Sequence, residues 1–146
     1  MCCWATRSDI NKMKVVINSC YGGFSLSNFA YKELLRRKGK ECYFYNWEFG
    51  KGYYRIDENP DEYFCVIVTT EDYGEFTTKI EHSVYYRDGE IRTDPDFIAM
   101  IEEFGSEKCG GKYSKLKIVE IPDDVNWEIN DYDGIETIHE VHRSWY

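Results

Sequence analysis

Short strand-like runs alternate with two amphipathic segments along this chain, and that alternation leaves few folds open. Residues 14–20, 41–46, 62–70 and 116–121 are rich in β-branched or aromatic side chains, which favour β-strands. Helical spacing of apolar residues separates the first of these runs from the second, and the third from the fourth. The pattern predicts an α/β (α+β) fold, a single mixed β-sheet with two or three helices packed on it.

Both predicted helices have clear end signals. Ser25 or Ser27 can cap the first helix with a side-chain oxygen, and Gly39 suits its C-terminal end. Asp94 is positioned to cap the second helix, with Pro95 at its first position, where proline is favoured. These caps make the two helices the best-defined elements of the sequence.

The remaining elements are expected from shorter patterns. The run at residues 62–70 has the strongest strand character and is expected at the centre of the sheet, with residues 82–86 at an edge. Residues 127–129 alternate and are expected to pair with the strand at 116–121. A third short helix is expected over residues 135–143.

Length and composition indicate one domain. The chain has 146 residues, of which 42% are apolar, and this suffices for a buried core. We expect residues 1–12 to be an N-terminal extension and residues 13–146 a single α/β domain. No apolar run approaches the roughly 18 residues of a membrane span. The six cysteines form no Cys-x-x-Cys pair and follow no signal-like stretch, so we expect free thiols in a reducing cytoplasm.

Charge is spread unevenly along the chain. The formal net charge is −9, but residues 1–40 carry +6 and residues 41–146 carry −15. Residues 118–141 contain eight carboxylates and neither Lys nor Arg. The overall acidity argues against direct binding to duplex nucleic acid. This uneven charge can orient the self-association of the chain into a homo-oligomer, or it can present two differently charged faces to partners. The alternative is that both halves of the chain simply have solvated surfaces.

A glycine-containing loop lies between the first strand and the first helix. Glycines let backbone amides approach a ligand, and a helix N-terminus favours an anion. The loop matches neither the P-loop nor the dinucleotide-binding pattern, so a tight turn followed by a helix cap is the alternative. The candidate ligand-binding residues are Tyr21, Gly22, Gly23, Phe24, Ser25, Ser27, Arg36 and Arg92.

Two patterns near the C-terminus resemble parts of metal sites. Residues 129–140 fit part of a calcium-binding loop, but Ile129 stands where the first ligand is required, so Asp133-Gly134 is interpreted as a turn. A single Glu-x-x-His motif at Glu136 and His139 is not a carboxylate-bridged metal site, which needs two copies. No local signature joins a nucleophile to a base. We therefore predict no catalytic residue, no metal and no cofactor.

Seven aromatic residues are crowded into residues 43–54. Strand alternation turns part of such a set outward, where Tyr and Trp form contact surfaces. The alternative is a hairpin with one core face. The aromatic side chains expected to contact a partner are Tyr43, Tyr45 and Trp47.

Two segments resemble a family of small proteins encoded by bacteriophages and prophages. They are MKVVINSCYGGFSLS at residues 13–27 and LKIVEIPDDVNWEINDYDGIETIHEVHRSW at residues 116–145, and residues 92–105 are similar to the same family. The family supplies no established reaction. The resemblance implies a phage accessory protein in the host bacterial cytoplasm, of the small acidic kind that often antagonises host defence.

Taken together, these features predict a non-enzymatic binding protein that counters a host defence system. In one mode, an acidic and aromatic surface occludes a host defence protein, and in the other the glycine loop sequesters a nucleotide second messenger. The alternative class is a small hydrolytic or nucleotide-modifying phage enzyme, which requires a nucleophile and a base in one cleft. The partner-binding residues of the first mode are Tyr43, Tyr45, Trp47, Asp123, Asp124, Asp131, Asp133 and Glu136.

Overall fold

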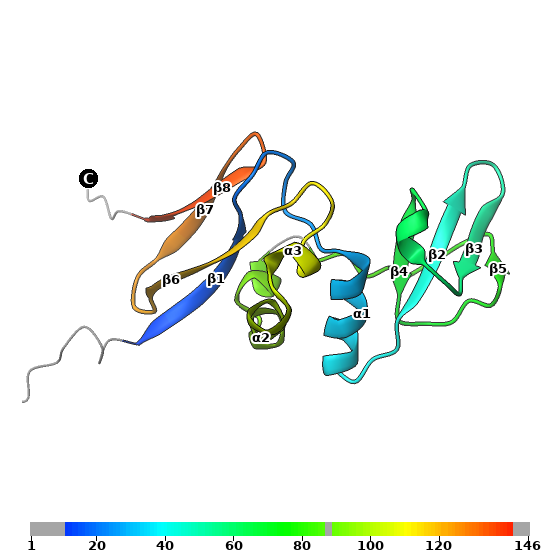
Figure 1. The fold of residues 1–146 in the computed structure, drawn as a ribbon, viewed down its shortest axis with the longest axis horizontal. Helices are drawn as coiled ribbons and strands as arrows, with labels where there is room; N and C mark the ends of the chain where they lie inside the picture. Colours follow the sequence, from blue (N-terminus) through cyan, green and yellow to red (C-terminus); the bar gives the residue numbers. More distant parts are fainter. Residues whose placement is uncertain (1–10, 87–88, 142–146) are drawn as a thin grey trace, which may run out of the picture.

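The computed structural model describes residues 11–86 and 89–141 of the chain. Within them, eight strands in antiparallel sheets and three α-helices form an α+β fold (Figure 1), which confirms the predicted class. None of these described helices is long and apolar enough to cross a membrane. In chain order the elements are β1 (Lys12–Asn18), α1 (Asn28–Arg37), β2 (Tyr43–Glu48), β3 (Gly52–Ile56), η2 (Pro60–Glu62), β4 (Val66–Thr69), β5 (Phe76–Thr77), η3 (Gly89–Thr93), α2 (Pro95–Phe104), α3 (Ser106–Cys109), β6 (Leu116–Pro122), β7 (Trp127–Tyr132) and β8 (Ile135–Glu140).

The elements are stacked along the long axis of the molecule (Figure 1). At one end lie the β1–β6 ribbon and the β7–β8 hairpin, which together we call the terminal β region. Helices α2 and α3 come next, followed by α1. The sheet with strand order β4-β2-β3-β5, which we call the four-stranded sheet, lies at the other end. The helices therefore separate two β regions.

One hydrophobic cluster joins both β regions to the helices. Val16 and Leu116 enter it from the terminal β region, and Phe44, Ile56 and Val68 enter it from the four-stranded sheet. Burial of this apolar surface is the main force that holds the layers together. The helical members of the cluster are Ala30, Tyr31, Leu34, Leu35, Phe97, Ile98, Met100, Ile101 and Cys109.

The predicted helix ends are confirmed. Ser27 is the N-cap of α1, and its Oγ accepts a hydrogen bond from the Ala30 N–H. Asp94 caps α2 by accepting from two backbone N–H groups, and Pro95 is the first helical residue. Gly39 follows the α1 C-cap with a φ of +72°, a conformation that glycine adopts without strain.

The strands differ from the expected single mixed sheet. They are divided among three sheets, and every strand pair is antiparallel. The strand at Val66–Thr69 is an edge strand rather than the centre, and the Val84 N–H donates to the Val68 carbonyl at 2.7 Å beside it. Strand propensity therefore located this segment but not its neighbours, because pairing depends on residues far away in sequence.

The prediction of a third helix over residues 135–143 is wrong. Residues 135–140 form β8, which pairs with β7, so β7 does not pair with β6 as expected. Asp133 and Gly134 link the two strands with φ angles of +53° and +92°. Two positive φ angles are typical of the tight two-residue hairpin turn, and the turn overrides helical spacing. Residue 12, placed in the extension, begins β1, and residues 1–10 and 142–146 lie outside the described residues.

Candidate functional site

The glycine loop is closely packed against two other segments. A Cβ at Gly22 would lie 2.1 Å from the Tyr113 carbonyl oxygen. A Cβ at Gly134, in the hairpin turn, would lie 2.6 Å from the backbone nitrogens of Gly22 and Gly23. These contacts explain the glycines by close approach of backbones, as the tight-turn alternative requires.

The serines of the loop are also engaged by the protein. The Ser25 carbonyl accepts a hydrogen bond from the Gly111 N–H at 3.0 Å, and the Ser27 N–H donates to the Cys109 carbonyl at 2.9 Å. The Ser27 hydroxyl donates to the Lys108 carbonyl at 2.6 Å. Tyr21 is exposed. The loop therefore pairs with residues 108–111 along much of its length.

Arg92 and Glu136, predicted to contact a ligand and a partner, instead bind each other. Their side chains are about 95% buried and form two hydrogen bonds of 2.5 and 2.8 Å. Arg92 also donates to the Val16 carbonyl at 3.2 Å, and its guanidinium lies 3.7 Å from the centre of the Phe24 ring. Glu136 accepts from the Asn18 N–H at 2.8 Å. Both predictions are corrected, because groups buried in this ion pair are not presented to a ligand or partner.

Asn18 completes this network and was missed at the sequence level. Its side chain is fully buried, and its amide donates to the carbonyls of Cys20 at 2.6 Å and Gly134 at 2.7 Å. Its carbonyl accepts from the Lys115 N–H at 2.8 Å. An Asn at the end of a buried apolar strand was the available signal. We call Asn18, Phe24, Arg92 and Glu136 the polar junction.

Arg36 lies away from the glycine loop. It sits in the last turn of α1, whereas the loop leads into the first turn. It forms an ion pair of 2.6 Å with Glu33, and the hydrogen bonds from Arg36 and Arg37 lower the pKa of Glu33 to about 2. The predicted anion site is therefore not assembled: one arginine is buried in the polar junction and the other is at the far end of a helix.

The three aromatic candidates have different surroundings. Tyr45 is fully buried, and its hydroxyl accepts from the Tyr73 N–H and donates to the Gly74 carbonyl, both at 2.8 Å. Its assignment to a partner surface is corrected. Trp47 is 41% exposed and packs edge-on against Phe49, with ring centres 5.8 Å apart. Tyr43 is half-buried, and its hydroxyl donates to the Glu41 carboxylate.

The acidic candidates are exposed. Asp123 and Asp124 lie between β6 and β7, and Asp131 and Asp133 lie in or beside the hairpin turn. Asp131 accepts a hydrogen bond from the Gly134 N–H at 2.8 Å, which supports the turn. Within residues 11–86 and 89–141, seven carboxylates of the terminal β region form no ion pair: Glu120, Asp123, Asp124, Glu128, Asp131, Asp133 and Glu140.

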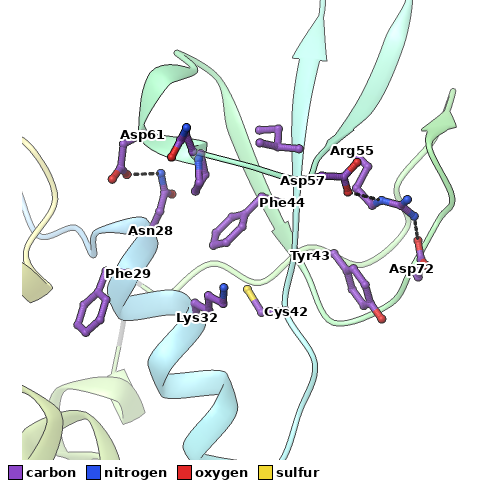
Figure 2. Close-up of a pocket in the computed structure, with 13 residues that line it drawn as sticks. Asn28, Phe29, Lys32, Cys42, Tyr43, Phe44, Arg55, Asp57, Asp61 and Asp72 are labelled. Atoms are coloured by element: carbon purple, nitrogen blue, oxygen red, sulfur yellow. Dashed lines mark hydrogen bonds and ion pairs between the residues drawn. The ribbon is translucent and has the colours of Figure 1, made fainter.

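A hollow of about 520 Å³ lies between α1 and the four-stranded sheet (Figure 2). Apolar lining comes from both sides, including Phe29 on α1 and Phe44 and Ile56 on the sheet. At its rim, Arg55 donates to Asp57 and Asp72, each at 3.0 Å. The sequence did not indicate this hollow, because its lining comes from several separate segments.

Cys42, the cysteine that lines this hollow, is a poor candidate for a catalytic nucleophile. Burial raises the pKa of the Cys42 thiol to about 11, so the thiolate is scarce at neutral pH. The described histidines, His82 and His139, are exposed and do not line the hollow. His142 lies outside the described residues.

The Glu-x-x-His motif does not lie on a helix, because residues 135–140 form a strand. Glu136 and His139 are three residues apart on a strand, and alternation places them on opposite faces. Within residues 11–86 and 89–141, no group of three or more His, Cys, Asp or Glu side chains is arranged to hold a metal ion.

Comparisons of the chain with protein-family models, with curated proteins and with solved structures give no match. The function is therefore inferred from the geometry and from the resemblance of the sequence.

Proposed function

We propose that this protein is a phage-encoded, non-enzymatic binding protein that occludes a host defence protein. The contact surface is the exposed part of the terminal β region that carries the seven carboxylates on its strands and turns, which we call the acidic face, and the partner presents a basic surface. One observation carries the proposal: the seven carboxylates of this face are not neutralised by ion pairs with described residues.

Unpaired carboxylates create a negative field that steers a basic partner toward the surface. The basic side chains at the C-terminal end of α1 are, by contrast, ion-paired. Arg36, Arg37 and Lys38 on α1 are paired with Glu33, Glu103 and two aspartates, so much of the positive charge of residues 1–40 is compensated locally. Residues 118–141 contain neither Lys nor Arg, so the negative charge of this stretch has no cation within it.

The polar junction supports protein occlusion over nucleotide sequestration. A nucleotide site needs cations directed at phosphates, and the Arg92 guanidinium is already directed at Glu136. The hairpin that carries the exposed carboxylates is held to β1 by the same pair, because Glu136 belongs to β8 and accepts from Asn18 of β1. The polar junction thus serves to fix the acidic face in position.

The test is capture of partners from a host lysate by the full chain. A variant with Asp123→Asn, Asp124→Asn, Asp131→Asn and Asp133→Asn should lose the captured protein, and binding by the unaltered chain should weaken as salt rises. The control is a variant with Glu71→Gln, Glu75→Gln, Glu90→Gln and Glu107→Gln, which loses the same charge from exposed positions elsewhere.

Two results would contradict the proposal. Equal retention of the captured protein by both variants would remove the acidic face from the interface. Heat released on titration with cyclic or linear nucleotides would favour nucleotide sequestration instead.

A further inference from the structure

The loop between β3 and β4 has an unusual composition. Residues 57–64, DENPDEYF, contain four carboxylates in the first six positions, followed by two aromatic residues. All four carboxylate side chains are exposed, and neither Glu58 nor Glu62 forms an ion pair with a described residue. We call this segment the acidic–aromatic loop.

The loop is anchored to α1 and separates two hollows. The Asn28 side chain donates to the Asp61 carboxylate at 2.9 Å, as Figure 2 shows. Asn28 and Asp61 line both the hollow of about 520 Å³ beside the four-stranded sheet and a second hollow of about 620 Å³. The two hollows therefore adjoin at the Asn28–Asp61 hydrogen bond beside the first turn of α1, and we call them together the groove.

The second hollow has aromatic side chains that the protein itself does not cover. Phe64 is 100% exposed, and Tyr63 and Tyr113, which line the same hollow, are 43% and 69% exposed. Leu26 contributes further apolar lining. Neighbouring exposed aromatics beside a hollow are typical of a contact surface, because a partner that covers them gains apolar burial.

Charge decides what kind of segment fits this groove. Asp57, Asp61 and Asp72 line the first hollow together with Arg55 and Lys32, and Arg55 is already bound to Asp57 and Asp72. Asp61 and Glu62 line the second hollow, opposite Lys112. The two hollows together are lined by four carboxylates and three cationic side chains, and this excess of one negative charge favours Lys or Arg side chains over phosphates and acidic peptides.

We propose that this groove binds an extended basic segment of a partner protein. Cationic side chains of the segment lie against the carboxylates of the acidic–aromatic loop, and one apolar side chain packs on Phe64 and Tyr63. The groove adjoins the first turn of α1 in the middle of the molecule, whereas the terminal β region that carries the acidic face lies at one end (Figure 1). The protein therefore has two separate contact surfaces.

The test measures retention of the labelled full chain on an array of short basic peptides, each of which contains one Phe, Trp or Leu. Control peptides on the same array have Glu in place of every Lys and Arg. We expect retention by basic peptides alone, and the tightest of them is then measured by fluorescence anisotropy. Phe64→Ser should weaken its binding about tenfold or more, as loss of a central aromatic contact does. Glu58→Gln with Glu62→Gln should weaken it several-fold.

The matched control is Asp123→Asn with Asp124→Asn, which removes the same charge from the acidic face and should change binding less than about twofold. Three results would overturn the proposal: no retention of basic peptides, equal weakening by the control, or no effect of Phe64→Ser. Sedimentation that detects a dimer abolished by Phe64→Ser would also overturn it, since the occupant would be a second copy of this chain.

Discussion

The two β regions on either side of the helices use the same residue types in opposite ways. Beside the terminal β region, Arg92 of η3 and Phe24 of the glycine loop join Asn18 of β1 and Glu136 of β8 in the buried polar junction. At the four-stranded sheet, Arg55 pairs with carboxylates at the rim of a hollow, and aromatic side chains such as Phe49, which follows β2, and Phe64, which precedes β4, are exposed. Residue type alone therefore does not say whether a side chain holds the fold or faces a partner.

The difference lies in whether the charged groups are removed from water and how their burial is compensated. Removing an ion pair from water is unfavourable unless further hydrogen bonds satisfy both groups. Glu136 receives hydrogen bonds from Arg92 and from the Asn18 N–H, so its burial is compensated. The exposed pairs of Arg55 remain in contact with water, and such pairs contribute little to stability.

The largest expected effect comes from breaking the buried pair. Glu136→Gln removes the buried carboxylate that accepts two hydrogen bonds from Arg92, and we expect a loss of about 3–5 kcal/mol in the free energy of unfolding, measured with urea. Asp72→Asn breaks an ion pair of Arg55 at the surface and should change stability far less. Similar losses in both variants would mean that the buried and the exposed ion pair contribute equally to stability.

A second test separates close packing from backbone strain. Gly134→Ala places a Cβ against the glycine loop at a φ of +92°, whereas Gly50→Ala places one in open space at a φ of +76°. The strain of about 1 kcal/mol is common to both, so the extra loss at Gly134, expected at about 1–2 kcal/mol, measures the packing. Equal melting curves for the two variants would contradict close packing at the hairpin turn.

A third test lies within the four-stranded sheet. Tyr45→Phe removes a buried hydroxyl that makes two hydrogen bonds of 2.8 Å, and we expect a loss of about 1–2 kcal/mol in chemical denaturation. Tyr54→Phe, at an exposed position of the neighbouring strand, should stay within about 0.5 kcal/mol of the unaltered chain. A larger loss of stability in Tyr54→Phe would show that this exposed hydroxyl also stabilises the fold.

The smallest expected effect depends on pH. The hydrogen bond from the Gly74 N–H, with that from Arg55, lowers the pKa of Asp72 below its ordinary value of 3.8. A lowered pKa in the folded state means that Asp72 stabilises the fold above that ordinary value, and that this contribution is lost as the pH falls through the folded pKa. Unfolding curves of Asp72→Asn and the unaltered chain should therefore differ near neutral pH and converge in acid. A gap that widens in acid would contradict this assignment.

The sequence by itself determined the features that depend on a few neighbouring residues. Ser27 and Asp94 cap helices because their side-chain oxygens reach backbone N–H groups two or three residues away. Asp133-Gly134 makes a turn because both residues tolerate a positive φ. The α+β class followed from these local signals together with the strand-like runs.

Only the tertiary structure decided which charged and aromatic side chains are buried. Arg92 and Glu136 are 44 positions apart, and Asn18 and Glu136 are 118 apart, so no local pattern could indicate that they meet. The groove beside the first turn of α1 likewise combines Asn28 with Asp61, 33 positions later. Burial depends on which strands and loops pack over a residue, and that packing is settled by contacts distant along the chain.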